Sequence, residues 1–337
     1  MTPGTPLRAA IIGAGLMGRW HADAVRRAGG NVAIVADPDP DRAAELAEEF
    51  GAPSTVRIGD ALSRNVADIV HVTTPPEEHV YSIRAALESG LHVLAEKPLA
   101  PSAAITAELY ALASTKSVLL CPVHQSLFQP GVVTLLRDVQ QLGRVRQVAV
   151  IICTAGANGG DDATRDRLVC DVLPHPLSLA ARIVAGGIAG TRWQAARAAA
   201  GEVQVSGIRE GVSISLLVST RGRPTRNNLS VTGEVGSVHA DLFHGFSFVE
   251  QRALSRVGKI VRPFGYAAGT LKAATVNLAR RAVRREPAFP GLRELVGRFY
   301  DAVSASSASP ISMAETLEVA AERDTIIRAL RLEGARV

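Results

Sequence analysis

The run Arg8-Ala9-Ala10-Ile11-Ile12-Gly13-Ala14-Gly15-Leu16-Met17-Gly18 decides the fold of the first part of this chain. An apolar strand is followed by a glycine-rich turn, and Trp20–Ala28 then has helical character. In such a loop Gly13 allows the tight turn, Gly15 lets the backbone approach a pyrophosphate, and Gly18 lets helix and strand pack closely. The phosphates are expected on the free N–H groups at the start of the helix, beside Leu16 and Met17.

The spacing G-x-G-x-x-G is weak by itself, because 30 glycines in one chain produce it by chance. A plain glycine turn is the alternative. Asp37 favours the dinucleotide site, since it lies 19 residues after Gly18, at the end of the next predicted strand.

Asp37 also indicates which dinucleotide is bound. A carboxylate there accepts hydrogen bonds from both ribose hydroxyls but repels a 2′-phosphate. Arg42 complicates this preference, although the simpler interpretation is a solvated helix residue after Pro38-Asp39-Pro40-Asp41. NAD is therefore the predicted cofactor, with NADP less favoured.

Two domains are expected from the length of 337 residues and from a change in the pattern of elements after about residue 122. In residues 1–122 strands alternate with helices, which predicts a doubly wound parallel sheet of the Rossmann type. The strands are Arg8–Ile12, Asn31–Ala36, Ile69–Val72, His92–Ala95 and Val118–Cys121, and the helices are Trp20–Ala28, Asp39–Phe50, Glu77–Ser89 and Ser102–Ser114.

Residues 123–337 are predicted to form an α+β domain, because strands there follow one another with few helices between them. The predicted strands are Arg146–Cys153, Glu202–Ile208, Val212–Ser219, Asn228–Thr232 and Ser237–Asp241. The predicted helices are Gly131–Gln141, Leu173–Val184, part of Ile260–Arg285, Leu292–Ser304 and Ala314–Leu332.

The composition is that of an ordinary folded protein, with 47% hydrophobic and 20% charged residues. The N-terminus lacks a signal-peptide pattern and no apolar segment reaches about 18 residues, so a cytoplasmic location is expected. The three cysteines, Cys121, Cys153 and Cys170, are widely spaced, so neither a disulfide framework nor a metal site is predicted. Aromatic residues make up only 4%, which argues against nucleic-acid binding.

Two further segments carry a resemblance to a known family. With Thr73-Thr74-Pro75-Pro76-Glu77-Glu78-His79 and Ala95-Glu96-Lys97-Pro98-Leu99, nearly the whole chain resembles the Gfo/Idh/MocA family, which includes glucose-fructose oxidoreductase and inositol dehydrogenase. The resemblance implies that both segments lie over the nicotinamide half of the cofactor. It implies cofactor contacts from Thr73, Thr74, Pro75, His79, Glu96 and Lys97.

The resemblance also implies an activity, the reversible oxidation of a secondary alcohol of a sugar, cyclitol or related polyol. It implies a second domain with a large, mostly antiparallel sheet that often mediates dimers or tetramers, so a homodimer or homotetramer is expected. The family's catalytic set is a lysine with an Asp-x-x-x-His element, which here corresponds to Lys97 with Asp171 and His175.

The chemistry of these residue types is consistent with that set. Hydride leaves a carbinol carbon only if the hydroxyl proton is removed, and His175 is a suitable base near pH 7. Lys97 would stabilise the developing alkoxide and Asp171 would fix the tautomer of His175. Pro174 and Pro176 predict a helix start near Asp171, which suits an N-cap. The alternative for His175 is a buried residue at a helix start.

The chain departs from the family at two places. Arg167-Leu168-Val169-Cys170 replaces a glycine run, and Ser178 replaces an acid. His124-Gln125-Ser126-Leu127 stands where the family often has Asn and Arg, so His124 and Gln125 are candidate substrate ligands. These changes predict an altered substrate pocket.

A basic helical insertion is predicted over about residues 252–288. Nine Lys or Arg and no acid occur from Arg252 to Arg285. The simpler interpretation is a packed or dimer-interface helix with a solvated basic face. The alternative is contact with a phosphate-bearing substrate such as a nucleotide sugar, or peripheral contact with an anionic membrane surface.

The predicted function is hydride transfer between NAD and a secondary alcohol or ketone of a sugar, cyclitol or nucleotide sugar, with Lys97 and His175 as the acid/base pair. Two alternatives remain: an NAD-dependent glycosidase of the same fold, and a non-catalytic NAD-binding regulator. Retention of Lys97, Asp171 and His175 argues against the regulator. The exact substrate and the direction of reaction stay open.

Overall fold

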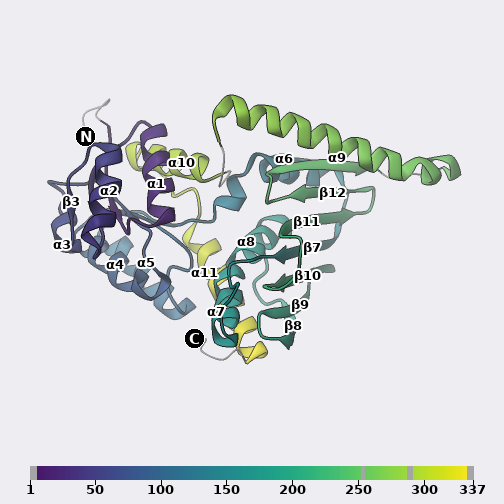
Figure 1. Cartoon of the computed structure of the whole chain (residues 1–337). Coiled ribbons are helices and arrows are strands. Elements are labelled where there is room, and N and C mark those ends of the chain that lie inside the picture. The colour runs from purple at the N-terminus through teal and green to yellow at the C-terminus, as the bar shows by residue number, and fades with distance from the viewer. Residues whose placement is uncertain (1–5, 252–254, 287–290, 332–337) are drawn as a thin grey trace. The chain divides into compact units, whose positions relative to one another are not determined.

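The chain divides into two units, and the second unit interrupts the first. The computed structural model describes residues 6–251, 255–286 and 291–331. Unit 1 contains Met1–His124 and Leu292–Ala320, and unit 2 contains Gln125–Gly291 and Ala321–Val337 (Figure 1).

The predicted boundary after residue 122 is close to this division, but one segment differs. Leu292–Ala320 groups with unit 1 rather than with the second domain. Helix α10 (Leu292–Ser304) buries Leu295 and Phe299 and packs beside α1 (Leu16–Arg27). The amphipathic pattern of α10 predicts a buried face, but the sequence does not say which unit supplies the partner.

Unit 1 is built on a six-stranded parallel sheet in the order β3-β2-β1-β4-β5-β6. This is the order of a doubly wound Rossmann sheet, with its topological switch point between β1 and β4. Every residue of β4 is buried, as expected for a parallel strand covered on both faces. The predicted fold class of this unit is confirmed. The strands are β1 (Arg8–Ile12), β2 (Asn31–Ala36), β3 (Ser54–Thr55), β4 (Ile69–Val72), β5 (His92–Ala95) and β6 (Leu120–Pro122).

Helices connect these strands, and several begin at polar caps. Asp39 accepts hydrogen bonds from the backbone N–H groups of Asp41 and Arg42, and Ser102 accepts one from Ile105 N–H. Helices α4 and α5 lie side by side, as do α1 and α10 (Figure 1). The remaining helices are α2 (Pro40–Phe50), α3 (Ile58–Ala61), α4 (Pro76–Glu88), α5 (Ala103–Thr115) and α11 (Met313–Leu330), the last of which continues into unit 2.

Unit 2 is built on a seven-stranded sheet in the order β13-β12-β11-β7-β10-β9-β8. All neighbouring strands are antiparallel except β7 and β10, so the expected mostly antiparallel sheet is confirmed. The strands are β7 (Val145–Cys153), β8 (Arg192–Ala199), β9 (Glu202–Arg209), β10 (Val212–Ser219), β11 (Arg226–Gly233), β12 (Gly236–Asp241) and β13 (Phe246–Gln251).

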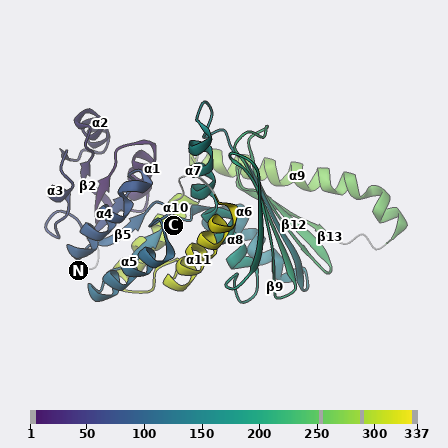
Figure 2. The same cartoon turned by 90° about the horizontal axis from the view of Figure 1, so that it is seen from below.

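One face of this sheet carries helices, which Figure 2 shows with the sheet nearly edge-on. Along β10, Val212, Ile214 and Leu216 are buried, whereas Ser213 and Leu217 are exposed. This period of two matches a sheet covered on one side. The helices of unit 2 are η1 (Gln125–Phe128), α6 (Pro130–Asp138), η2 (Val139–Gln141), α7 (Asp162–Val172), α8 (Pro174–Ile183) and α9 (Arg256–Arg284), with the end of α11.

Helix α7 overturns one expectation about Asp171. The sequence predicts a helix that starts near Asp171, with this residue as its N-cap. Instead Asp171 lies in the last turn of α7, which is capped at Asp161, and Leu173 occupies the N-cap position of α8. The backbone stays helical through Leu173, but Pro174 has no N–H to continue the hydrogen-bond ladder, so two helices meet there.

Candidate functional site

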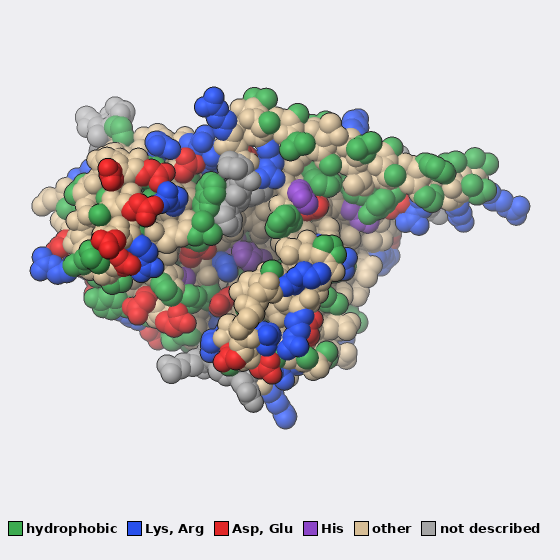
Figure 3. Space-filling view, in the orientation of Figure 1, with side chains coloured by type: hydrophobic (Ala, Val, Ile, Leu, Met, Phe, Trp, Pro, Cys, Tyr) green, Lys and Arg blue, Asp and Glu red, His purple; other side chains and the backbone are tan. Residues whose placement is uncertain are grey.

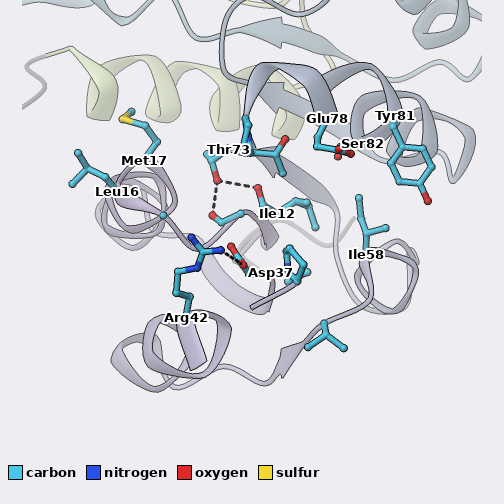
Figure 4. Close-up of a pocket in the computed structure, with 17 residues that line it drawn as sticks. Ile12, Leu16, Met17, Asp37, Arg42, Ile58, Thr73, Glu78, Tyr81 and Ser82 are labelled. Atoms are coloured by element: carbon cyan, nitrogen blue, oxygen red, sulfur yellow. Dashed lines mark hydrogen bonds and ion pairs between the residues drawn. The ribbon is translucent and has the colours of Figure 1, made fainter. Parts of the chain in front are cut away.

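A pocket of about 650 Å³ opens at the carboxyl ends of β1, β2 and β4 in unit 1 (Figure 4). This position is the topological switch point, where doubly wound sheets bind ligands. Its lining contains eight of the residues predicted to bind the cofactor: Gly13, Gly15, Leu16, Met17, Asp37, Thr73, Thr74 and Pro75.

Two glycines of the loop are required by the protein's own packing. Gly13 has a φ of +100°, and a Cβ atom there would lie 2.7 Å from the carbonyl oxygen of Thr73. A Cβ on Gly18 would lie 2.0 Å from the carbonyl oxygen of Gly13. Side chains at these positions would collide with backbone, so both glycines hold the turn against β4.

Gly15 differs, because a Cβ atom built on it meets nothing within 4 Å. It lines the pocket and occupies the N-cap position of α1, where no side chain caps the helix and no acidic residue lies in the first turn. The helix therefore presents its N-terminal N–H groups and the positive end of its dipole without a protein counter-charge from its own first turn. A pyrophosphate fits this arrangement.

Asp37 follows β2 and is almost fully buried. Its Oδ2 accepts a hydrogen bond of 2.8 Å from Ala14 N–H, and its Oδ1 accepts one of 2.9 Å from Asp39 N–H. The carboxylate thus ties the glycine loop to the end of β2. Because a carboxylate offers about four acceptor sites, capacity remains for a hydroxyl in the pocket.

Arg42 reaches the same carboxylate, which the sequence-based interpretation as a solvated residue does not anticipate. Its Nη2 lies 3.2 Å from Asp37 Oδ1 (Figure 4). Its Nε lies 3.1 Å from Asp39 Oδ2. The side chain is still 57% exposed and lines the pocket. The pocket therefore has both a carboxylate and a guanidinium at the position that distinguishes NAD from NADP.

The Thr73-Thr74-Pro75 turn forms the opposite wall. Thr73 Oγ1 lies 2.8 Å from the Gly13 carbonyl oxygen and 3.0 Å from that of Ile12, so its hydroxyl donates to the loop after β1. Thr74 Oγ1 is buried in the pocket lining and has no hydrogen-bond partner within the described ranges. Such a buried hydroxyl is satisfied when a polar ligand binds beside it.

His79 lies one turn into α4 and is buried away from this pocket lining. Its Nδ1 lies 2.7 Å from the carbonyl oxygen of Pro98, and its Nε2 lies 2.9 Å from that of Thr74. The ring bridges the turn after β4 and the turn after β5. This geometry favours a positioning role for His79 over direct contact with the cofactor.

Glu96 and Lys97 follow β5, at the same edge of the sheet but outside the lining of this pocket. Glu96 Oε1 lies 3.2 Å from Nε2 of the buried His21. Burial acts to raise the pKa of the Glu96 carboxyl, but the hydrogen bond and charge of His21, with Lys97 and His79, lower it overall. Glu96 is therefore held as a carboxylate next to Lys97.

Asp171 and His175 lie in unit 2, on either side of the junction between α7 and α8, and both are half-buried. Ser178, which stands where the family has an acid, donates a hydrogen bond of 2.9 Å to the carbonyl oxygen of His175. The hydroxyl thus supports the first turn of α8. Burial raises the pKa of the neighbouring Cys170 to about 12, so this thiol stays protonated at neutral pH.

The two candidate substrate ligands fall on different units. His124 is buried at the end of unit 1. Gln125 begins η1 in unit 2, and its Oε1 is buried without a hydrogen-bond partner in the part of the chain that the structure describes. Gln125 therefore has an unused acceptor, which a substrate hydroxyl can satisfy.

Several lining residues were not predicted. They come from the segment after β3, from the start of α3 and from α4: Val56, Ile58, Glu78, Tyr81 and Ser82. Val56 and Tyr81 are large and exposed, at 53% and 61%. Exposed apolar side chains beside a pocket suit the flat face of a nucleobase.

Comparison with protein families gives a match for the N-terminal part of the chain. A family model described as "Oxidoreductase family, NAD-binding Rossmann fold" matches residues 7–124. This segment contains the whole glycine loop, Asp37, and the turns after β4 and β5.

A curated relative is similar to part of the chain. The inositol 2-dehydrogenase of Corynebacterium glutamicum is 40% identical over 98 residues, which cover 28% of this chain and 29% of that protein. The alignment thus spans less than a third of the relative's length.

Solved structures match the fold over both units. The WlbA dehydrogenase of Bordetella pertussis, in complex with NADH and UDP-GlcNAcA, has a TM-score of 0.78 at 17% identity and covers 97% of this chain and 96% of its own. A 3-ketoreductase of Actinomadura kijaniata, in complex with NADP, has a TM-score of 0.75 at 20% identity and covers 97% of this chain and 98% of its own.

Proposed function

We propose that the chain is an NAD-dependent dehydrogenase or reductase, on the premise that residues 7–124 match the model of the NAD-binding Rossmann family of oxidoreductases. It transfers a hydride between the nicotinamide and a secondary alcohol or ketone of a sugar, cyclitol or nucleotide sugar. Inositol and nucleotide-sugar substrates enter the proposal through the relatives that carry those names.

One observation carries the proposal. The pocket at the β1/β4 switch point combines an uncapped helix N-terminus at Gly15, the Asp37 carboxylate and the unsatisfied hydroxyl of Thr74. These groups suit the pyrophosphate, a ribose hydroxyl and a polar part of the cofactor, respectively. Lys97 follows a strand at the same sheet edge.

The bound nicotinamide would accept or donate the hydride, and the chain's residues would handle the proton. In the oxidation direction, we assign His175 as the base that removes the hydroxyl proton and Asp171 as the group that orients its ring. Lys97 donates a hydrogen bond to the same oxygen and stabilises its negative charge. In reduction the roles reverse, and His175 donates the proton.

Both neighbours of Lys97 in the sequence are held by buried histidines. Glu96 is anchored to His21, and the carbonyl of Pro98 contacts the ring of His79. The backbone on both sides of Lys97 is therefore restrained, which fixes the point from which its side chain extends.

The open face of the sheet in unit 2 supports the proposal of a homodimer or homotetramer. Ile208 and Leu217 are exposed there at 58% and 38%, and Leu217 pairs with the half-buried Ile151. Sedimentation velocity of the full chain tests this association, because substitution of Ile208 and Leu217 by Ser should shift the protein toward monomer.

The catalytic assignment is tested with Lys97→Ala and His175→Ala. Each variant should bind NAD as the parent does, measured by calorimetry, and should lose at least about 100-fold in kcat, the usual contribution of a general base. Near-normal turnover in both variants would show the assignment to be wrong. Arg182→Ala, on α8 but outside the proposed set, serves as the control.

A panel of inositols, hexoses and nucleotide sugars distinguishes the alternatives. A dehydrogenase releases NADH in proportion to substrate, whereas an NAD-dependent glycosidase cleaves a glycosidic bond with no net NADH. A non-catalytic regulator binds NAD and a sugar without turnover of any member of the panel.

A further inference from the structure

Helix α9 has a long apolar stripe that no other described residue covers. Val257, Phe264, Leu271 and Leu278 recur every seven residues along it, and Ile260 lies on the same side. Their exposed fractions are 68%, 75%, 69%, 70% and 73%, in the order Val257, Phe264, Leu271, Leu278 and Ile260. Figure 3 shows hydrophobic side chains along the outer length of this helix. Within the described residues, nothing packs on this side of α9.

The opposite side of α9 is already used to attach the helix to the sheet of unit 2. The ring of Tyr266 packs edge-on against Phe248 of β13, with centroids 4.9 Å apart. Arg262 forms an ion pair with Glu250, and the buried Asn277 donates a hydrogen bond of 2.9 Å to the carbonyl oxygen of His244. These contacts fix which side of the helix points outward.

The charge of α9 has one sign. Between residues 255 and 285 there are eight Lys or Arg and no Asp or Glu. On a helix with 100° per residue, Arg256 and Lys272 fall on the two borders of the apolar stripe. The basic residues are Arg256, Lys259, Arg262, Lys272, Arg280, Arg281, Arg284 and Arg285.

We propose that the outer face of α9 binds the surface of a bilayer containing anionic phospholipids, with the helix lying in the plane of the interface. The apolar stripe would enter the boundary between headgroups and acyl chains. The flanking Arg256 and Lys272 would reach the lipid phosphates. This inference does not depend on the proposed oxidoreductase activity.

Charge decides between a bilayer and a second copy of the chain. Two α9 helices packed through their stripes would bring the basic borders of both copies together, with no acid in either helix to pair with them. An anionic lipid surface instead offers phosphates to the cations at the borders of the stripe. The stripe and the borders thus both suit the bilayer.

The distribution of charge also sets the orientation of α9. Its basic residues extend from Arg256 to Arg285, so insertion across the hydrocarbon core would bury several cations. In the interfacial plane the helix, about 43 Å long at 1.5 Å per residue, keeps its stripe in the membrane and its charges at the surface. Over the described ranges, no helix is long and apolar enough to cross a membrane.

The test is vesicle flotation of the full chain. Vesicles of phosphatidylcholine with about one third phosphatidylglycerol, whose phosphates give the surface a negative potential that attracts basic segments, should carry the protein to the top of the gradient. Pure phosphatidylcholine vesicles should bind at least ten-fold less. Raised salt should weaken the binding, because it screens the attraction of the phosphates.

A matched pair of variants locates the contact. Leu271→Ser with Leu278→Ser should lower vesicle binding at least ten-fold, and since both side chains are about 70% exposed the fold should be kept. Val133→Ser with Val235→Ser, which removes two exposed apolar residues elsewhere in unit 2, should leave binding within two-fold of the parent.

Phe264→Trp gives a readout that does not depend on losing binding. Its fluorescence, after subtraction of the parent signal from Trp20 and Trp193, should shift to shorter wavelength when anionic vesicles are added. Absence of flotation, flotation that the Leu271/Leu278 variant keeps, or an unshifted spectrum of the Phe264→Trp variant would each overturn the proposal. So would a dimer in sedimentation velocity that the Leu271/Leu278 variant dissociates, because the stripe would then be a protein interface.

Discussion

The Nδ1 atoms of His21 and His71 lie 2.9 Å apart inside unit 1, a hydrogen-bond distance that requires one ring to donate and the other to accept. His21 continues to Glu96 through Nε2, and His71 continues to the hydroxyl of Tyr300 on α10 at 3.0 Å. This series of hydrogen bonds is buried and connects the segment after β5 to α10, which begins almost 200 residues later in the sequence. It anchors Glu96, the neighbour of the proposed catalytic Lys97.

Stability should fall in mild acid because of His71. Burial, and secondly the charge of His21, hold the pKa of His71 well below 6.5. Below pH 6.5 the unfolded chain binds a proton at this residue and the folded chain does not. As the pH falls from 6.5 towards the pKa of His71 in the folded protein, the free energy of unfolding therefore decreases by up to about 1.4 kcal/mol per pH unit. Above pH 6.5 this effect is absent.

His71→Gln removes this proton uptake. The decrease in Tm between pH 7.5 and pH 5.5 should be smaller in the variant than in the parent, whatever its Tm at pH 7.5. This window lies above the range in which Glu96 is protonated, since the pKa of Glu96 is lowered. His244→Gln, at an exposed site, should reproduce the parent's decrease. An equal decrease in all three proteins would contradict the role of His71.

Gly15 and Gly18 should respond differently to alanine. Gly15→Ala places a methyl group in open space, so the free energy of unfolding should change by less than about 1 kcal/mol while the Kd for NAD rises at least ten-fold. Gly18→Ala forces a collision with the Gly13 carbonyl and should cost about 1–3 kcal/mol of stability. Calorimetric binding and urea unfolding measure both. Unchanged NAD affinity in Gly15→Ala would argue against phosphate binding at this loop.

Arg42 should raise the kcat/KM for NADP. Its guanidinium neutralises part of the Asp37 charge and can contact a 2′-phosphate. Arg42→Ala should lower kcat/KM for NADP about ten-fold and leave that for NAD within about two-fold, the effect of one charge-assisted hydrogen bond. The matched control is Arg57→Ala, which removes an exposed arginine paired with Asp60. If both cofactors lose equally, Arg42 does not discriminate between them.

Asp37→Ala should shift the cofactor preference in the opposite direction to Arg42→Ala, towards NADP. Loss of the carboxylate removes an acceptor for a ribose hydroxyl and the repulsion of a 2′-phosphate, so the ratio of kcat/KM for NAD over NADP should fall at least ten-fold. The variant also loses the hydrogen bond from Ala14 N–H, so its unfolding should be measured alongside. An unchanged ratio would contradict the assignment of Asp37.

Glu322 should be important for the stability of unit 2. Its side chain is almost fully buried, and its carboxylate accepts hydrogen bonds from Gly190 N–H at 2.9 Å and from the indole N–H of Trp193. Glu322→Ala removes both hydrogen bonds to this nearly buried carboxylate and should cost about 2–4 kcal/mol in urea unfolding. Glu108→Ala removes an exposed ion pair with Arg84 and should cost less than about 1 kcal/mol. Similar losses in the two variants would contradict this view.

The local patterns of unit 1 were sufficient to predict most of its sheet. Strands β1, β2, β4 and β5 have the predicted bounds, because short β-branched and apolar runs between glycine and proline signals leave little choice. The two-residue β3 was missed, since two residues carry no periodicity. In unit 2 the strands β8 and β13 were also missed, and for β8 the reason is that its Arg-Trp-Gln-Ala-Ala-Arg-Ala-Ala sequence does not alternate.

The sequence by itself determined the dinucleotide loop of this protein. Gly13, Gly18 and Asp37 contact residues at the carboxyl ends of the parallel strands β1, β2 and β4. The alternation of strands and helices in the sequence is sufficient to predict this parallel sheet. Lys97, Asp171 and His175 were likewise proposed as catalytic residues from short sequence motifs alone.

Only the tertiary structure decided which partners these residues have. The ion pair of Arg42 with Asp37, the buried chain from Glu96 to Tyr300, and the outward direction of the α9 stripe all join or separate groups through space. Hydrophobic periodicity indicates that a face exists, but burial is a property of what packs against it. The apolar face of α10 is buried because it packs beside α1 in unit 1, whereas the apolar stripe of α9 is exposed.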